Sequence, residues 1–270
     1  MSRKRLVMFF VGLGLAILLI TMVTKAHVVT VKHYEVAIEE LPPAFDGLRV
    51  LHVTDLHSKK YGDKQKGLAD LLGKEEYDLV AVTGDIVDMR NRSLEPATKF
   101  IELLGDKPVF FVPGNHEVKT GIEFREKLDE LEVTRLENRA LKFQYGGQHI
   151  WLVGVNDPHE DWDKLVDALS EVIDGSPRVL LAHSPTIFEQ AVEQEIDLVL
   201  AGHTHGGQIR LPFLGVLFIS GQGLFPRYVY GEYMEGKTTM IVNSGIGETV
   251  FNIRLETKPE VVIVTLRPIS

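Results

Sequence analysis

Apolar and polar positions divide the chain from residue 48 onward into a repeating pattern. Apolar runs of about five residues, a length typical of buried strands, alternate with longer stretches in which apolar residues recur at helical spacing. The strand candidates are 48–54, 79–83, 109–112, 150–155, 179–182, 198–201 and 240–242. The helix candidates are 65–74, 94–104, 122–131, 163–173 and 187–195. Strands that alternate with helices predict an α/β fold whose sheet is largely parallel and covered on both faces.

Strand patterns also occur outside this repeat. Residues 27–46 alternate between apolar and polar positions until Pro42-Pro43 interrupts them, which predicts a strand near a sheet edge. Residues 260–266 form a last apolar run, and 141–145 with 149–155 predict a hairpin around two glycines. These additional strands favour two packed mixed sheets with helices outside them.

The amino terminus differs in composition from the rest. Residues 6–24 contain no charged side chain, and as a helix they would be about 28 Å long, close to a hydrocarbon thickness of about 30 Å. Basic residues at 3–5 precede this run and only Lys25 follows it closely, so the positive-inside rule places the amino terminus in the cytoplasm. We therefore expect residues 1–25 to be an uncleaved, single-pass anchor in the cell membrane and residues 26–270 to be one domain outside the cytoplasm.

The uncharged run has two other interpretations. A cleaved signal peptide would need small residues before its cleavage site, and Thr24-Lys25-Ala26 fits that requirement poorly. A buried core helix would leave the basic cluster at its start without a reason. Both fit the sequence less well than an anchor.

Composition and charge narrow the chemistry. A chain of 270 residues with 44% hydrophobic residues can bury a full core, and it has no cysteine, so disulfides and thiolate metal sites are excluded. The formal charge is -9 overall, and because residues 1–25 carry four basic groups and no acidic ones, the remainder carries -13. Such a surface does not attract nucleic acid, and we expect no specific nucleic-acid binding. The same charge is compatible with a phosphate substrate if bound cations reverse the field locally.

Polar motifs follow five of the apolar runs. His203 and His205 lie one residue apart among small residues, which allows both imidazoles to reach one site. Similar motifs end the other runs, so the candidate ligands of a metal site are Asp55, His57, Asp85, Asn115, His183, His203 and His205. Active groups of α/β proteins gather at the carboxyl ends of strands, which is where these motifs are expected.

These residue types suit two divalent cations. Four imidazoles, two carboxylates and one amide oxygen favour Mn, Fe, Zn or Co over calcium, which prefers oxygen ligands alone. Two cations close together need an anion between them, and Asp85, in the middle of the set, is the best candidate for that bridge.

The motifs together resemble those of the calcineurin-like metallophosphoesterase superfamily. The resemblance covers residues 48 to 207 and rests on Asp-x-His at 55–57, Gly-Asp at 84–85, Gly-Asn-His-Glu at 114–117, His183 and Gly-His-x-His at 202–205. It implies a four-layer α-β-β-α sandwich. The motif Gly-His-Thr-His-Gly-Gly-Gln, with His-Ser-Pro upstream, is similar to that of the bacterial membrane-associated branch of the superfamily. Some members of that branch cleave a nucleotide-linked diacylglucosamine. Thr186 stands where that branch leads us to expect an acidic residue.

The resemblance also implies a role for each residue. One metal would be held by Asp55, His57, Asp85 and His205, and the other by Asp85, Asn115, His183 and His203. Asp85 would be shared. His116 matches the family's non-ligand histidine, which steadies the transition state or protonates the leaving oxygen, a task that suits an imidazole pKa near 6.5. Hydroxide bridging both metals would attack phosphorus in line with the leaving group.

These features predict a binuclear metal phosphohydrolase with His116 and Asp85 as catalytic residues. The substrate would be a phosphodiester or pyrophosphate, with a monoester also open, and an anchor at residues 6–24 favours a lipid-linked or envelope substrate. A different class of function is a binding module that keeps the fold and loses activity. Loss of ligands normally accompanies that change, and none is missing here.

Several other residues have two interpretations. We expect His52 to be a packed core histidine, because strand parity turns it away from Asp55. Glu117 could accept a hydrogen bond from a ligand imidazole or begin a helix in solvent, and we favour the latter. Asp88 and Asp157 could support ligands; Arg210, Arg227 and Arg254 are expected at the surface. Residues 206–237 would be a long loop over the site or a simple connection. Its apolar residues could touch lipid or belong to the core: Phe213, Leu214, Leu217, Phe218 and Phe225.

Overall fold

The protein is described by a computed structural model. The described residues are 28–91, 93–120, 122–156, 164–207, 210–211, 215–216, 218–219, 222–247 and 257–269, with residues 4, 5, 9 and 12. The anchor predicted at 6–24 therefore lies outside them except at two positions. Among the residues that are described, no helix has both the length and the apolar character needed to cross a bilayer.

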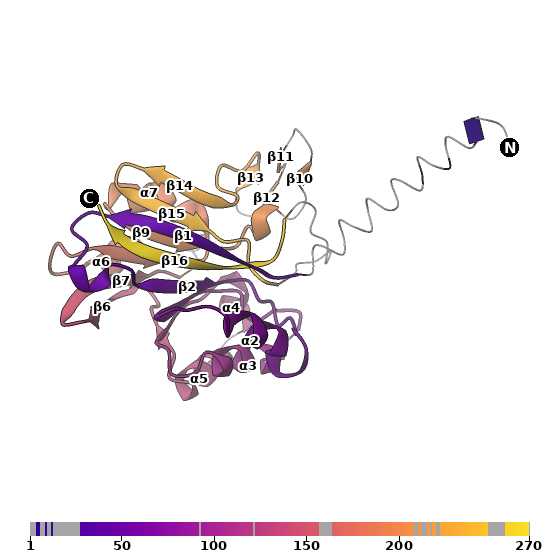
Figure 1. Ribbon diagram of the computed structural model, residues 1–270, viewed down its shortest axis with the longest axis horizontal. Helices are drawn as coiled ribbons and strands as arrows, with labels where there is room; N and C mark the ends of the chain where they lie inside the picture. Colours follow the sequence, from indigo (N-terminus) through magenta and orange to yellow (C-terminus); the bar gives the residue numbers. More distant parts are fainter. Residues whose placement is uncertain are drawn as a thin grey trace.

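Two six-stranded mixed sheets form the framework (Figure 1). The first has the order β1 (Thr30–Ile38), β16 (Glu260–Pro268), β2 (Arg49–Val53), β3 (Leu79–Thr83), β4 (Val109–Val112) and β5 (Thr134–Arg135). The second has the order β14 (Gly231–Glu235), β15 (Thr238–Val242), β9 (Leu198–Ala201), β8 (Arg178–Leu181), β7 (Gln148–Gly154) and β6 (Arg139–Tyr145). In the first sheet all neighbouring strands are parallel except β16 and β2, which are antiparallel. In the second sheet the strands from β7 to β15 are parallel, and the antiparallel pairs β6–β7 and β14–β15 form its two edges.

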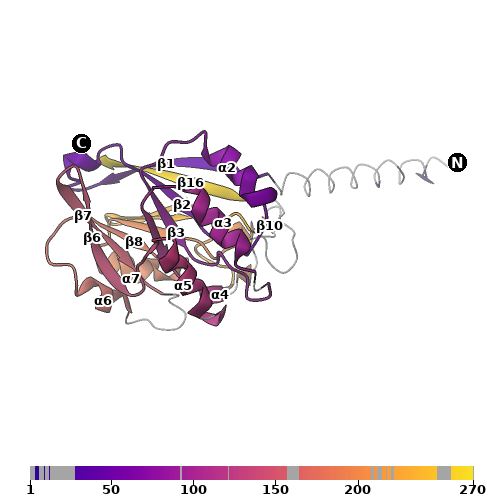
Figure 2. The same ribbon diagram turned by 90° about the horizontal axis from the view of Figure 1, so that it is seen from below.

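Helices cover the outer face of each sheet, which gives four layers. The helices α2 (Lys66–Leu72), α3 (Glu95–Leu103) and α5 (Ile122–Glu130), with the short α4 (Asn115–Thr120), lie over the first sheet (Figure 2). The second sheet is covered by α6 (Lys164–Leu169) and α7 (Phe188–Glu193). Strand alternation explains the layers: Val50 packs between the sheets with Leu181, whereas Leu51 packs outward against the helix side with Phe100.

Most predicted elements are confirmed, with small shifts at their ends. The strand expected in 27–46 is β1 at a sheet edge, and the predicted hairpin is β6 and β7. The prediction of two packed mixed sheets with helices outside them is confirmed. The helix-strand repeat taken alone, which suggested one sheet covered by helices on both faces, is not sufficient, because one face of each sheet packs against the other sheet. The helix expected over 163–173 ends at Leu169.

The stretch 206–237 is more structured than a loop. It contains the 3-10 turn η4 (His205–Gly207) at its start, the short strands β10 (Arg210–Leu211), β11 (Gly215–Val216), β12 (Phe218–Ile219) and β13 (Gly223–Leu224), and then β14. The prediction of a loop is therefore wrong at these positions. The β12–β13 pair is antiparallel, as is β10–β11.

Candidate metal centre

The loops after five strands deliver the predicted ligands to one end of the molecule, which we call the site pole. Asp55 and His57 follow β2, and Asp85 follows β3. Asn115 and His116 begin α4 directly after β4, His183 follows β8, and His203 and His205 follow β9. The site pole is thus where carboxyl ends of strands from both sheets meet.

One group of possible ligands consists of Asp55, His57 and His205. The Nε2 atoms of His57 and His205 are 3.1 Å apart. Asp55 Oδ1 lies 3.6 Å from His57 Nε2 and 3.4 Å from His205 Nε2. All three residues are buried.

A second group consists of Asp85, His183 and His203. His183 Nε2 lies 3.3 Å from Asp85 Oδ2 and 3.0 Å from His203 Nδ1. Asp85 Oδ2 is also 3.8 Å from His57 Nε2, so this one oxygen is close to both groups.

Except for the slightly longer 3.6 Å between Asp55 Oδ1 and His57 Nε2, the distances within each group fit a divalent cation. Metal–ligand bonds of about 2.1 Å place neighbouring ligand atoms about 3.0 to 3.4 Å apart, depending on the coordination angle. Asp55 Oδ1 and Asn115 Oδ1 are buried and accept no hydrogen bond within the described part of the chain. A bound cation would satisfy a buried oxygen atom that has no hydrogen-bond donor.

Hydrogen bonds to the remaining atoms fix how these side chains point. Asp55 Oδ2 accepts hydrogen bonds from Thr54 Oγ1 at 2.8 Å and from the backbone N–H of His203 at 2.9 Å. Asp85 Oδ1 accepts the backbone N–H of His116 at 2.9 Å. His183 Nδ1 lies 2.8 Å from the Thr83 carbonyl oxygen, which assigns its proton to Nδ1 and leaves a lone pair on Nε2.

The backbone of the site is strained. The candidate ligands with left-handed φ values are Asp55 (53°), His57 (49°), Asp85 (52°), His203 (72°) and His205 (49°). Residues other than glycine rarely adopt this region, and such strain collects at functional sites. Gly202 lets two loops touch, because a Cβ atom there would lie 2.7 Å from Asp55 Oδ2.

Buried carboxylates among imidazoles carry the charge of the site. Burial raises the pKa of Asp55, but the charges of His205, His183 and His57 outweigh burial and hold that pKa well below its usual value. Burial also raises the pKa of Asp85, and His183 more than reverses this. Both carboxylates are therefore ionised at neutral pH and present negative charge in a place shielded from water.

Glu117 is the functional residue whose environment differs most from the sequence interpretation. Its side chain is buried, not in solvent at a helix start. Its carboxylate accepts the backbone N–H groups of Asp85 (2.7 Å), Gly114 (2.8 Å) and Val87 (3.0 Å). Glu117 therefore ties the loop after β3 to the loop after β4. Burial, and next the charge of Asp85, raise the pKa of Glu117 to about 7.

His116 lies at the edge of the site. Its Nε2 is 3.9 Å from Asp85 Oδ2, and its ring contacts the ring of His57 with centroids 4.5 Å apart. The backbone N–H of Met89 donates to His116 Nδ1 at 3.2 Å, which places the proton of the neutral ring on Nε2. Burial lowers the pKa of His116, although Asp85 opposes this. Asp88 Oδ1 is 3.6 Å from His116 Nδ1 and also pairs with Arg90.

The other residues named from the sequence have ordinary environments or are not described. His52 is fully buried, its Nε2 is 2.8 Å from Thr83 Oγ1, and burial lowers its pKa to about 3, which confirms a packed core histidine. Arg227 pairs with Glu189 at the surface. Ser184 Oγ lies 3.0 Å from the Thr186 hydroxyl. Asp157, Arg254 and the side chain of Arg210 lie outside the described residues.

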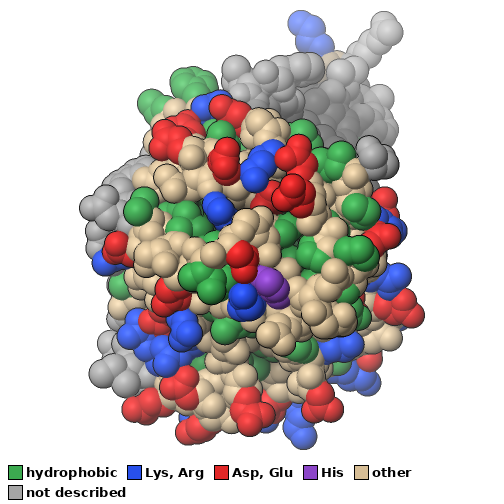
Figure 3. Space-filling view, turned by 90° about the vertical axis from the view of Figure 1, so that its left-hand side faces the viewer, with side chains coloured by type: hydrophobic (Ala, Val, Ile, Leu, Met, Phe, Trp, Pro, Cys, Tyr) green, Lys and Arg blue, Asp and Glu red, His purple; other side chains and the backbone are tan. Residues whose placement is uncertain are grey.

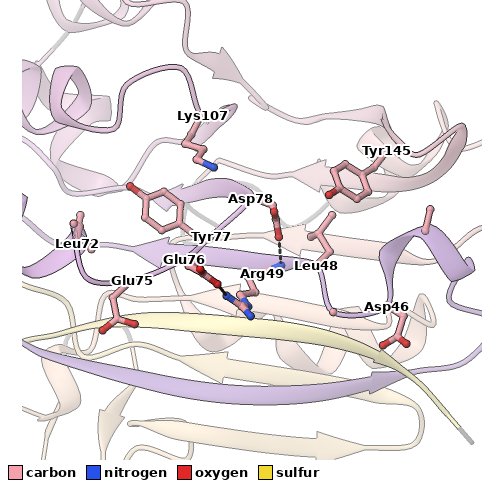
Figure 4. Close-up of a pocket in the computed structure, with 13 residues that line it drawn as sticks. Asp46, Leu48, Arg49, Leu72, Glu75, Glu76, Tyr77, Asp78, Lys107 and Tyr145 are labelled. Atoms are coloured by element: carbon pink, nitrogen blue, oxygen red, sulfur yellow. Dashed lines mark hydrogen bonds and ion pairs between the residues drawn. The ribbon is translucent and has the colours of Figure 1, made fainter.

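A separate hollow of about 670 Å³ lies at the opposite pole. Residues at or just before the amino ends of strands line it, among them Arg49, Tyr77, Asp78 and Lys107, together with Tyr145 at the carboxyl end of β6 (Figure 4). Acidic, basic and apolar side chains are interspersed over this end of the molecule (Figure 3). None of the predicted site residues lines this hollow, so the metal centre does not extend to it.

The stretch that carries the candidate ligands is similar to known proteins. A family model described as calcineurin-like phosphoesterase matches residues 48–207. The phosphodiesterase YaeI of Escherichia coli (strain K12) is 29% identical over 81% of this chain and 82% of its own length. A Danio rerio transmembrane protein with metallophosphoesterase domain is 28% identical over 86% of this chain and 56% of that protein.

Among solved structures, the chain is similar to a sulfate thiohydrolase, SoxB, from Thermus thermophilus. The TM-score is 0.50 at 16% identity, over 84% of this chain and 58% of that one. At this identity the similarity concerns the fold alone.

Proposed function

The chain belongs to the calcineurin-like phosphoesterase family, and from that membership we propose that it is a binuclear phosphohydrolase that cleaves a phosphodiester or pyrophosphate bond. A metal-dependent phosphoesterase is what the family and the His and Asp cluster support directly. The observation that carries the binuclear proposal is Asp85 Oδ2, which lies 3.3 Å from a nitrogen of one group and 3.8 Å from a nitrogen of the other.

Seven side chains would hold the two ions. Asp55, His57 and His205 would bind one, His183, His203 and Asn115 would bind the other, and Asp85 would serve both. Mixed imidazole and carboxylate ligands suit Mn, Zn, Fe or Co. When bound, such a pair lowers the pKa of a shared water and neutralises charge on phosphate oxygens.

The chain's own residues supply position and hydrogen bonding. Asp55 and Asp85 stay ionised because imidazoles surround them, and the N–H groups of His203 and His116 hold their second oxygens in place. His116 would donate from Nε2 to a phosphate oxygen as charge develops there. The Met89 N–H on Nδ1 favours this role over proton transfer, because it stabilises the neutral ring.

The substrate would be lipid-linked or part of the cell envelope. Support comes from the uncharged run at 6–24 with basic residues before it, which we propose anchors the chain in the cell membrane with residues 26–270 outside the cytoplasm. The similarity to a transmembrane protein of Danio rerio agrees with an anchor in this family.

Hydrolysis assays test the proposal. The full chain in mild detergent, supplied separately with Mn²⁺ and Zn²⁺, is expected to hydrolyse a chromogenic phosphodiester or a nucleotide-linked lipid pyrophosphate. The Asp85→Asn variant is the control and is expected to be inactive. A metal-loaded native chain that releases no more product than Asp85→Asn from either substrate would contradict the proposal.

A further inference from the structure

Leu224 and Phe225 form an exposed apolar pair. Their side chains are 71% and 73% exposed, and no other two consecutive positions in the described part of the chain carry exposed large hydrophobic side chains. Phe225 also has φ 53°, a backbone region that disfavours any residue with a Cβ atom. Phe225 is thus unfavourable in two respects: its apolar side chain is exposed to solvent, and its backbone lies in a region that such residues rarely adopt.

The pair belongs to the site pole. It lies in the stretch that leaves the metal centre after His205 and returns by Tyr228. Thr204 Oγ1 donates to the Val229 carbonyl oxygen at 2.6 Å, and a Cβ atom on Gly207 would collide with Val216. Both ends of the stretch are therefore fastened to the segment that carries His203 and His205. Figure 1 shows β10, β11, β12 and β13 together at this end.

The amino-terminal part of the chain meets the domain at the same pole. Thr30 pairs with Glu260, whose backbone N–H donates to the Gly245 carbonyl oxygen. A Cβ atom on Gly245 would lie 2.6 Å from the Cβ atom of Asp55. The start of β1 is thus close to the metal centre, and Val28 just before it is 63% exposed. Only residues 25–27 separate Val28 from the uncharged run at 6–24.

We propose that Leu224 and Phe225 rest in the interface of the lipid bilayer that holds residues 6–24, so that the site pole faces the membrane. The anchor and the apolar pair then attach the same pole at two places, which fixes the orientation of the domain. The metal centre receives a phosphoester presented by the lipid surface. This inference rests on the anchoring and the lipid-linked substrate of the proposed function and adds to them the orientation of the domain on the bilayer.

Because the chain has no cysteine, a single introduced cysteine can be labelled specifically. The full chain is reconstituted in phospholipid vesicles with a nitroxide at Leu224→Cys, which retains Phe225. Ile173→Cys and Met234→Cys are matched controls, because these apolar side chains are 79% and 69% exposed but lie towards the opposite pole, before β8 and beside the start of β15. Relaxation of each label by oxygen and by a water-soluble nickel chelate reports its contact with lipid or water.

We expect reconstitution to raise the oxygen-to-nickel ratio at position 224 and to leave it unchanged at 173 and 234. In the Leu224→Ser, Phe225→Ser double variant, the ratio of turnover on a vesicle-embedded phosphoester to turnover on a soluble diester should fall about tenfold. If the chain floats with the vesicles but the oxygen-to-nickel ratio at position 224 changes no more than at 173 and 234, the contact of Leu224 and Phe225 with the bilayer is wrong, while the anchor stands. A chain that does not float with them overturns the anchor as well, while hydrolysis of the soluble diester tests the chemistry separately.

Discussion

Replacing Gly202 by alanine tests whether the close contact between two loops sets the geometry of the metal centre. The added Cβ atom would collide most closely with Thr54 Oγ1, and it would lie 2.6 Å from Thr54 Cγ2 and 2.7 Å from Asp55 Oδ2, where ordinary contact begins at 3.4 Å. The carboxylate must therefore move by about 0.7 Å, a shift that overpacking forces on its surroundings. Gly202 is not among the residues with positive φ, so the collision and not backbone strain is the perturbation.

The cost follows from the bonds that Asp55 would lose. Its Oδ2 accepts hydrogen bonds from Thr54 Oγ1 and the His203 N–H, and each bond to a charged group contributes about 1.5 to 3 kcal/mol. Loss of both lowers the free energy of unfolding of the metal-free protein by about 3 to 6 kcal/mol. At roughly 2 to 4 °C per kcal/mol for a domain near this size, the melting temperature falls by at least about 6 °C. Metal affinity falls about 10- to 100-fold, because Asp55 Oδ1 moves with its partner oxygen.

Gly175→Ala is the matched control. A Cβ atom at Gly175 would meet nothing within 4 Å, and that residue has no positive φ, so its stability should stay within about 0.5 kcal/mol of the native value. Thermal melting of the metal-free protein and titration calorimetry with Mn²⁺ measure the two effects. If Gly202→Ala and Gly175→Ala melt together and bind metal equally well, the contact does not set the site and our reasoning about it is wrong.

Three further predictions concern single residues and the ions. His116→Ala should lower kcat about 10²- to 10⁴-fold while elemental analysis finds unchanged metal content; a loss of metal would make it a ligand instead. The folded-state pKa of Glu117 is raised to about 7 from 4.5. The protonated carboxyl group therefore contributes favourably to the free energy of unfolding below pH 4.5, and this contribution is lost as pH rises through 7. Glu117→Gln should therefore gain about 2 to 4 kcal/mol relative to the native metal-free protein between pH 4.5 and pH 8 in denaturant titrations, and a constant difference would contradict this. Removing the ions with a chelator should lower the melting temperature of the native protein, and restoring Mn²⁺ or Zn²⁺ should reverse the change; equal melting with and without ions would argue against a site in the folded state.

The alternation of short apolar runs with helical stretches was sufficient to predict the sheet strands, because buried parallel strands consist of short runs of apolar residues. Val109–Val112 and Leu79–Thr83 were located to the residue. The strand Gly231–Glu235 was missed because it is an edge strand with polar and half-exposed side chains, and nearby glycines and aromatics suggested a loop. The helix-strand repeat alone suggested one sheet covered on both faces, and only the additional strand patterns at 27–46, 141–155 and 260–266 favoured the two packed sheets that the structure has.

The candidate ligands were predictable from motifs at strand ends, and the structure brings Asp55, Asp85 and four histidines together. Glu117 was misjudged because its burial depends on contacts with Val87 and Asp85, which are distant in the sequence. The one available signal was its position in Gly-Asn-His-Glu, three residues after Gly114, whose N–H it accepts. The tautomer of His116 also depends on a tertiary contact, with Met89, and no sequence pattern indicates it.

Counting the ions bound to the purified chain tests the central claim most directly. Elemental analysis after loading with Mn²⁺ or Zn²⁺ and removal of free ions should find two per native chain. It should find no more than one in Asp85→Asn, since the carboxylate near both groups would then lack its charge. A native chain that retains none or one, or an Asp85→Asn chain that still retains two, would contradict a pair of cations joined by Asp85.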